Sequence, residues 1–488
     1  MLGCSLSVCD QGHHVDKIFK LKENGTSVRT EIIAGITTFM TMAYIIALNP
    51  NLLTGWRAGG DQLWNAVFLA TCLASGIAMV CMAFLANKPF CLAPGMGLNS
   101  FFAVVVTQIA MITGATYVAS FQAALVIVLS EGIVFLVLTI CNIREKIVAA
   151  IPTCVRLGIT PALGLMLLNI ALGSNAGVMD SQGNMFYVLR DYFGALTPAS
   201  AASSMTDAFG PMVVTVLTML GGLFLIVMLT HKGVKGSVLW GMLAATAFYW
   251  ACEALFLGTD PFANLATASW VPAFGDMANL TLFKFNFEGL LSLGWATVVS
   301  LVITLCLIDM FDTIGTLVGT AQQSGMLDED GSAPWMKSAL LSDAIGTVVG
   351  ACTGTSTVTT FAESTAGVTA GGRTGLTALT CGVLFFLCIF IAPVAAVIPP
   401  AATSAALAYV GVVMLESLGK VQWRKLEDAV PIALMMIAMP ISGSIGHAIG
   451  LSLVAFSVLN ICMGQASKKY WLTYVLSVIF LISFFVVV

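Results

Sequence analysis

The chain has 488 residues, of which 58% are apolar and only 9% are charged, and its formal net charge is −4. Soluble domains carry about 25% charged residues, so this composition, with a mean hydropathy of +0.97, excludes a soluble enzyme, a disordered chain and a coiled coil. Apolar runs of about 20 residues, each long enough to cross the hydrocarbon core of a bilayer, follow one another along the sequence. We therefore expect an all-α polytopic membrane protein embedded in the lipid bilayer, with no basic run suited to nucleic acid.

Fourteen membrane spans are predicted after a polar N-terminal segment, 1–30. The first seven lie at 31–50, 66–86, 94–111, 118–140, 156–172, 211–231 and 236–257. The other seven lie at 295–317, 338–353, 355–370, 375–398, 403–418, 428–463, which is expected to break near Pro440, and 469–487. Because each half has an odd number of spans, the second half enters the membrane inverted, which is the inverted-repeat plan of secondary transporters.

Basic residues predict the orientation in the membrane. Of the 20 Lys and Arg residues, 15 fall on the side of the two termini, and the other five are Arg57, Arg190, Lys284, Lys468 and Lys469. Cytoplasmic loops carry the excess of basic residues, so we expect both termini in the cytoplasm and the polar stretches 173–210 and 258–293 on the opposite side. The lysine pair before the last span fits poorly: either it snorkels, or the last two spans are misplaced.

Two predicted spans begin with sequence that disfavours a helix. The third opens with 93–99 (APGMGLN), which Pro and Gly interrupt, and the tenth opens with 353–360 (TGTSTVTT), a β-branched run that prefers extended backbone. Ordinary Gly/Pro kinks are one interpretation. The other is that paired broken segments in matching positions of two halves mark the binding site of a transporter, with short extended pieces in spans three and ten.

Carboxylates inside spans cost about 2.5–3.5 kcal/mol each on insertion scales, so they need a reason. Asp309 and Asp312 are three residues apart and share one helical face. Glu363 follows the extended run, where the N–H groups of a beginning half-helix stabilise a carboxylate. Asn99 holds the corresponding place in span three, where it is expected to cap the half-helix. A structural role is an equally good interpretation for Asp312. Asp343, Glu131 and Glu253 are interpreted as packing or helix-end groups.

These groups predict a pocket near the middle of the membrane, where the two half-helices begin beside span eight. Carboxylates, a carboxamide and free backbone groups accept N–H donors, so the pocket suits a neutral, flat heterocycle and repels an anion. A carboxyl group removed from water holds a proton more readily, which makes Asp309, Asp312 and Glu363 candidate proton carriers. We see no metal-ligand spacing, and we expect no cofactor.

At these residues the sequence resembles the AzgA-like branch of the nucleobase transporters, permeases for hypoxanthine, guanine and adenine within the uracil permease superfamily. The matching stretches cover nearly the whole chain: 30–39 through 49–50, 93–102, 309–317, 327–331, 354–360, 363–364 and 371–377. The resemblance implies a seven-plus-seven inverted repeat in which a core domain (31–140 and 291–400) moves against a gate domain (141–290 and 401–488). It also implies proton symport of purine bases by alternating access in the cell membrane.

The resemblance further implies which residues bind the base. Glu363 and Asp309 would hold it, and Asp312 and Asn99 are also implicated. Phe361 and Ala362, where many relatives have Tyr-Val, are expected to form the surface on which the base stacks. Homodimers occur among fold relatives, so a homodimer is also expected. A pyrimidine or anion carrier of the same fold, a channel and a membrane-embedded enzyme are the alternatives.

Overall fold

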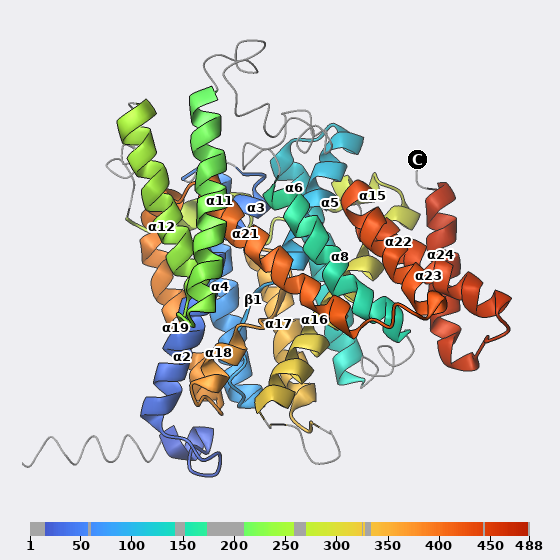
Figure 1. The fold of residues 1–488 in the computed structure, drawn as a ribbon, viewed down its shortest axis with the longest axis horizontal. Helices are drawn as coiled ribbons and strands as arrows, with labels where there is room; N and C mark the ends of the chain where they lie inside the picture. The colour runs from blue at the N-terminus through green and yellow to red at the C-terminus, as the bar shows by residue number, and fades with distance from the viewer. Residues whose placement is uncertain are drawn as a thin grey trace, which may run out of the picture.

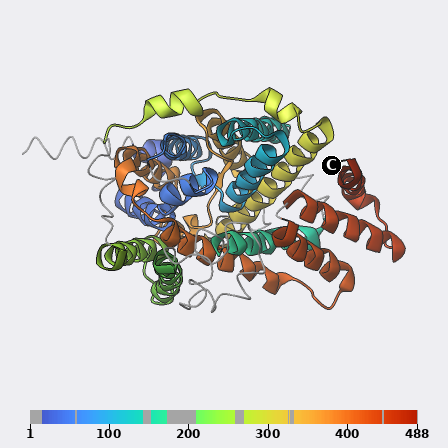
Figure 2. The same cartoon turned by 90° about the horizontal axis from the view of Figure 1, so that it is seen from above.

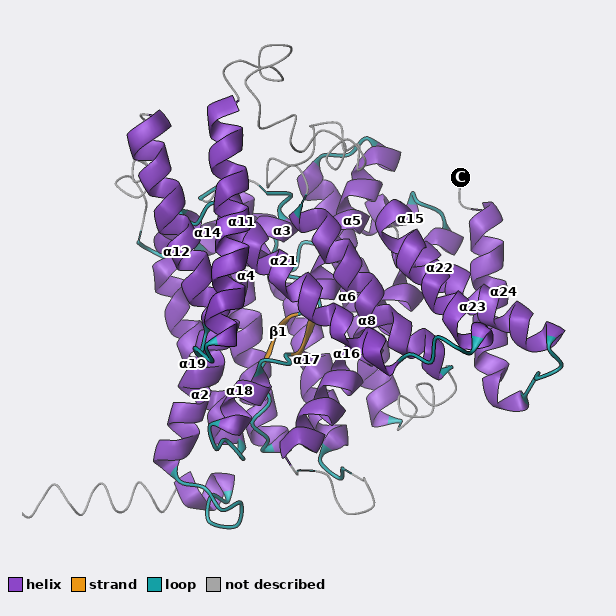
Figure 3. Ribbon diagram, viewed as in Figure 1, coloured by secondary structure: helices purple, strands orange, loops and turns teal. Residues whose placement is uncertain are grey.

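The computed structural model describes residues 15–56, 60–141, 152–172, 209–257, 270–324, 326, 333–442 and 445–486. Helices dominate these ranges (Figure 1), and one two-stranded antiparallel sheet lies among them, drawn in orange in Figure 3. Ten helices in the described part of the chain are long and apolar enough to cross a membrane, and two shorter apolar helices lie at His447–Cys462 and Trp471–Ile482. The predicted polytopic, mostly helical membrane protein is therefore confirmed.

The helices and strands of the first half follow the predicted order. They are α2 (Val28–Met42), α3 (Ile45–Leu53), α4 (Gln62–Cys81), η1 (Met82–Ala86), β1 (Leu92–Pro94), α5 (Met96–Thr113), α6 (Tyr117–Ile140), α8 (Thr153–Ala171), α11 (Phe209–His231), α12 (Ser237–Cys252) and η3 (Glu253–Leu257). The first predicted span is interrupted at Ala43–Tyr44, between α2 and α3.

The second half begins with two short helices that precede its long ones. Its elements are α14 (Phe274–Leu280), α15 (Phe287–Leu291), α16 (Trp295–Ser324), α17 (Met336–Thr353), β2 (Val358–Thr360), α18 (Ser364–Thr369), α19 (Gly375–Cys388), η4 (Ile389–Ile391), α20 (Ala392–Ala396), α21 (Pro400–Met414), η5 (Leu415–Lys420), α22 (Leu426–Ser442), α23 (Ile445–Cys462), η6 (Lys468–Tyr470) and α24 (Trp471–Val486).

Several helices begin at a side chain that accepts a hydrogen bond from a free backbone N–H. Ser27 accepts from the N–H of Thr30 at the start of α2, Asp61 caps α4 and Thr116 caps α6 in the same way. Each cap of this kind is worth about 0.5–2 kcal/mol. They fix where the membrane-length helices begin, because the apolar runs themselves carry no boundary.

The start of α19 is held from α2. Glu31, which is fully buried, accepts hydrogen bonds from the backbone N–H of Arg373 (2.8 Å) and Thr374 (3.2 Å) and from the hydroxyl of Thr377 (2.6 Å). A buried carboxylate is stabilised by several such donors. The contact ties the first span to the helix that follows the interrupted segment of the second half.

Helices from the two halves of the sequence interleave. In one group, α19 packs against α2 and α4, α17 against α4 and α6, and α18 against α2. In a second group, α8 packs against α21 and α22, α11 against α12 and α21, and α23 against α24. Figure 2 shows α11 and α12 at one end of the molecule and α22 to α24 at the other.

The structure adds detail to two predicted regions of the second half. The span at 428–463 is broken near Pro440, as expected: α22 ends at Ser442, α23 begins at Ile445, and the two helices pack against each other. Both Pro431 and Pro440 are accommodated inside α22. The polar stretch predicted at 258–293 contains α14, which packs against α4, and α15, which packs against α6. Gln122 of α6 also donates to the carbonyl of Leu280 at 2.9 Å.

Some predictions fall outside the described residues. These are most of the polar stretch 173–210, the first part of 258–293, Arg57, Arg190 and the matching stretch 327–331.

Candidate functional site

The two interrupted segments meet, as the sequence predicts. β1, which precedes α5, pairs antiparallel with β2, which precedes α18, and Ala93 lies opposite Thr359. The pairing continues at both ends, because the N–H of Gly95 donates to the carbonyl of Thr357 (3.1 Å) and the N–H of Phe361 donates to that of Cys91 (3.0 Å). All six strand residues are buried. The backbone hydrogen bonds that a helix would have supplied are thus made between the two halves of the chain.

Side chains from five surrounding helices hold the threonine-rich run 355–359, which we call the threonine segment. Each residue of the segment is engaged by a different helix. The pairs are Asn49 of α3 with Thr355 (3.0 Å), Asn99 of α5 with Ser356, Glu131 of α6 with Thr357, Thr347 of α17 with the carbonyl of Val358 (3.1 Å), and Thr313 of α16 with Thr359 (2.6 Å). The threonine segment is therefore held in one extended conformation, because each of its residues makes a hydrogen bond with a surrounding helix.

Glu363 lies directly before α18, at its N-cap position, and is half-buried. Its side chain makes no capping hydrogen bond, and α18 has only six residues. The carboxylate instead accepts a hydrogen bond of 2.7 Å from the hydroxyl of Tyr44, a buried residue in the break between α2 and α3. The carboxylate is therefore oriented by a tyrosine of the first half rather than by its own helix.

The two aspartates of α16 have different surroundings. Asp309 is fully buried and accepts a hydrogen bond of 2.9 Å from Thr313. Asp312 is half-buried and lies within electrostatic range of both Asp309 and Glu363. One of its carboxylate oxygens is 3.6 Å from the place that a Cβ on Gly95 would take. Asp312 and Glu363 are thus the half-buried acidic groups where the two halves meet, and Asp309 is fully buried.

Asn99 is fully buried, and both ends of its amide are engaged by the protein. It donates to the carbonyl of Pro94 at 3.2 Å and accepts from Ser356. The expectation that Asn99 caps the half-helix is wrong, because α5 begins at Met96 with Gly95 as its N-cap. Asn99 lies inside the first turn instead, where it joins the interrupted segment of one half to that of the other.

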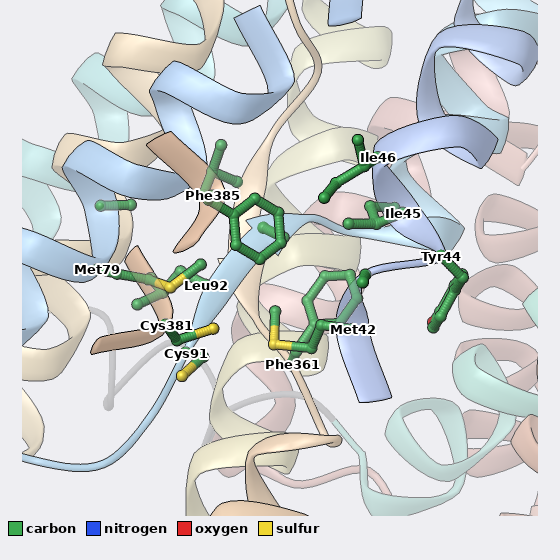
Figure 4. Close-up of a cluster of buried hydrophobic side chains, with 14 of the residues drawn as sticks. Met42, Tyr44, Ile45, Ile46, Met79, Cys91, Leu92, Phe361, Cys381 and Phe385 are labelled. Atoms are coloured by element: carbon green, nitrogen blue, oxygen red, sulfur yellow. The ribbon is translucent and has the colours of Figure 1, made fainter. Parts of the chain in front are cut away.

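Phe361 and Ala362 differ in burial. Phe361 is buried in a hydrophobic cluster that includes Met42, Cys91 and Phe385 (Figure 4), whereas Ala362 is exposed. The small side chain before Glu363 is therefore exposed, and the aromatic ring before it belongs to the hydrophobic core.

Glu131 and Asp343, interpreted from the sequence as packing groups, are fully buried and contact the site's own framework. Glu131 accepts from Thr357, and Asp343 lies 3.2 Å from the hydroxyl of Thr313. Tyr44, which donates to Glu363, is a residue of the site that the sequence does not single out. One property of the sequence could have pointed to the two acids. The cost of placing either of them in a membrane span is as high as for Asp309. Among the described residues, no three His, Cys, Asp or Glu side chains are grouped to hold a metal ion.

Paired interrupted segments, carboxylates beside them and a set of membrane-length helices are together the features of a membrane transport protein. The chain belongs to the Permease family (Xan_ur_permease), whose sequence profile matches residues 29–449. The predicted family resemblance is thereby confirmed.

The chain is similar to two curated relatives and to one solved structure. Adenine permease AdeP of Escherichia coli is 36% identical, over 92% of this chain and 91% of its own. Guanine/hypoxanthine permease PbuO of Bacillus subtilis is 34% identical, over 96% of this chain and 100% of its own. The transmembrane domain of a cyanobacterium bicarbonate transporter, BicA, has a TM-score of 0.60 at 16% identity, covering 87% and 97% of the two chains, which shows a shared fold. These relatives are permeases, in agreement with a transporter rather than an enzyme.

Proposed function

We propose that the protein is a secondary active transporter that takes up purine bases, hypoxanthine, guanine or adenine, together with protons. The observation that carries the proposal is the position of Glu363 and Asp312, two half-buried carboxylates where the interrupted segments of the two halves meet. The names of the relatives, adenine and guanine/hypoxanthine permeases, support purines as the substrate class.

The chemistry of the pair suits a neutral base. A purine base presents N–H donors at its ring edge, and a carboxylate accepts two of them side by side. In the proposal the flat ring lies against the exposed Ala362, next to Glu363, whose carboxylate accepts a hydrogen bond from Tyr44. An anion would meet two carboxylates and be repelled. A pyrimidine such as uracil also carries N–H donors, so a pyrimidine carrier is the second candidate.

The helix packing supports two domains that move against each other. In the proposal, 31–140 and 291–400 form a core domain that carries the site, and 141–290 and 401–488 form a gate domain. The contacts of α17 and α19 with α2, α4 and α6 fall within the core, and those of α8, α11 and α12 with α21 and α22 fall within the gate. Alternating access would move the core against the gate. Fourteen membrane segments in a seven-plus-seven repeat, cytoplasmic termini, a place in the cell membrane and a homodimer complete the proposal.

Transport by the purified protein in proteoliposomes tests the function. Labelled adenine and hypoxanthine should accumulate when the interior is more alkaline than the medium, and unlabelled purines should compete while uracil should not. Competition by uracil at equal concentration would favour the pyrimidine alternative. Exchange of bases without gradient-driven accumulation would refute proton coupling.

Replacing Tyr44 with Phe should weaken base binding while keeping transport. The change removes only the hydroxyl that donates to Glu363 at 2.7 Å. A hydrogen bond to a charged group contributes about 1.5–3 kcal/mol, so the KM for the base should rise about 10-fold or more. Initial uptake rates over a range of base concentrations measure the change. An unchanged KM would show that Tyr44 does not orient Glu363.

A further inference from the structure

Thr313 lies between two buried carboxylates on neighbouring helices. Its hydroxyl oxygen is 2.9 Å from Oδ1 of Asp309 on α16, and 3.2 and 3.3 Å from the two carboxylate oxygens of Asp343 on α17. It is also 2.6 Å from the hydroxyl of Thr359 in the threonine segment. Asp309, Thr313, Asp343 and Thr359 are all almost completely inaccessible to solvent.

The hydroxyl of Thr313 has a single proton for these neighbours. It donates to one acceptor only and accepts through its lone pairs. If it donates to Asp309, the contact with Asp343 is satisfied when the Asp343 carboxyl carries a proton and donates to Thr313. The mirror arrangement, with the proton on Asp309 and Thr313 donating to Asp343, uses the same atoms. The geometry thus fits one shared proton in two positions.

Burial favours the same conclusion. Two ionised carboxylates removed from water and placed around one hydroxyl repel each other, so one proton between them is the stable state. The other acidic side chains on the surrounding elements are Asp312 on α16, Glu131 on α6 and Glu363 before α18. They add negative charge and strengthen the preference.

We propose that Asp343 is a second proton-holding residue, coupled to Asp309 through the hydroxyl of Thr313. The inference rests on the proposed proton symport and deepens it. In the transfer, the O–H bond of Asp309 breaks as its proton passes to the oxygen of Thr313, while the proton of Thr313 forms a new O–H bond on Asp343. No proton is gained or lost in this step, and no other reactant takes part.

The hydrogen bond between Thr313 and Thr359 connects this proton to the base site. Thr359 lies four residues before Glu363 and pairs with Ala93 of β1. In both arrangements the proton of Thr313 goes to an aspartate, so the hydroxyl of Thr359 donates in the bond between the two threonines. This bond joins the two aspartates to the threonine segment, which leads to Glu363.

Counterflow and gradient-driven accumulation of labelled adenine, measured on the same proteoliposomes, test the inference. Thr313→Val removes the hydroxyl at nearly constant shape, Thr313→Ser keeps it, and Asp343→Asn removes the proton position. At an imposed pH difference of about one unit, symport of one proton per base gives about 10-fold accumulation. We expect the Val and Asn variants to keep counterflow within about threefold of the wild type, a change equal to the loss of about one hydrogen bond. Their accumulation ratio should fall to about one, and the Ser variant should behave as the wild type.

Two results would overturn the inference. One is wild-type accumulation by Asp343→Asn or Thr313→Val, which would show that neither group carries the coupled proton. The other is equal loss of counterflow and accumulation in both variants, which would show a purely structural role. A wild-type protein that exchanges adenine but fails to accumulate it would instead refute proton symport itself, so the two failures are distinguishable.

Discussion

Exchange of Glu363 for Gln should lower the uptake of purine bases about 100-fold, because the loss of one charged partner of a buried hydrogen-bonded pair costs about 2–5 kcal/mol. The carboxylate would accept two N–H groups of the base, whereas the amide of Gln accepts with one end and donates with the other. The hydrogen bond from Tyr44 can still be accepted by the amide oxygen, so the local structure should persist.

Uptake of labelled adenine and hypoxanthine into proteoliposomes measures this change. Glu288→Gln is the matched control. It is the same chemical change, made at an exposed residue of α15 away from the site. Both variants should give folded protein in equal amounts. Uptake by Glu363→Gln equal to that of the control would remove Glu363 from the site.

Gly95→Ala should reduce transport about 10- to 100-fold, the effect of an overpacking cost of about 1–3 kcal/mol. A Cβ on Gly95 would lie 2.6 Å from Cγ2 of Thr359 and 3.0 Å from a terminal carbon of Leu98. The contact with Leu98 is to the end of a flexible side chain, but Thr359 is β-branched and bonded to Thr313 at 2.6 Å. The added methyl group therefore presses on Thr359 and so on the strand pair.

The control for Gly95→Ala is Gly275→Ala, since a Cβ at Gly275 would meet no atom within 4 Å. Rates of counterflow and melting temperatures of the two purified variants separate a local effect on the site from general destabilisation. Wild-type counterflow by Gly95→Ala would show that the strand pair tolerates a shift, and that its geometry does not define the site.

The interrupted segments could be predicted from the sequence because the signal is local. Pro94, Gly95 and the threonine run disfavour a helix wherever they stand, and the structure makes strands of 92–94 and 358–360. The pairing of Ala93 with Thr359 could not be predicted, because it joins residues 266 positions apart by backbone bonds that leave no mark on either segment.

The roles within the site were harder to predict than its location. The spacing of Asp309 and Asp312 places them on one helical face, but their different burial depends on which helices pack against that face. Tyr44 reaches Glu363 only because the first span is interrupted at Ala43–Tyr44, and no Pro or Gly lies at that break. Asn99 was expected to be the N-cap from its position alone, but α5 begins three residues earlier, and Gly95 is its N-cap.

The interrupted segments of the two halves should place Glu363 and Asp312 at one shared base site. A high-resolution electron cryo-microscopy map of the protein in lipid nanodiscs with bound adenine tests it most directly. We expect density for the base beside Ala362, with its N–H edge within hydrogen-bond distance of Glu363 or Asp312. Base density enclosed by α8, α21 and α22 away from both carboxylates, or continuous helices in place of β1 and β2, would rule this site out.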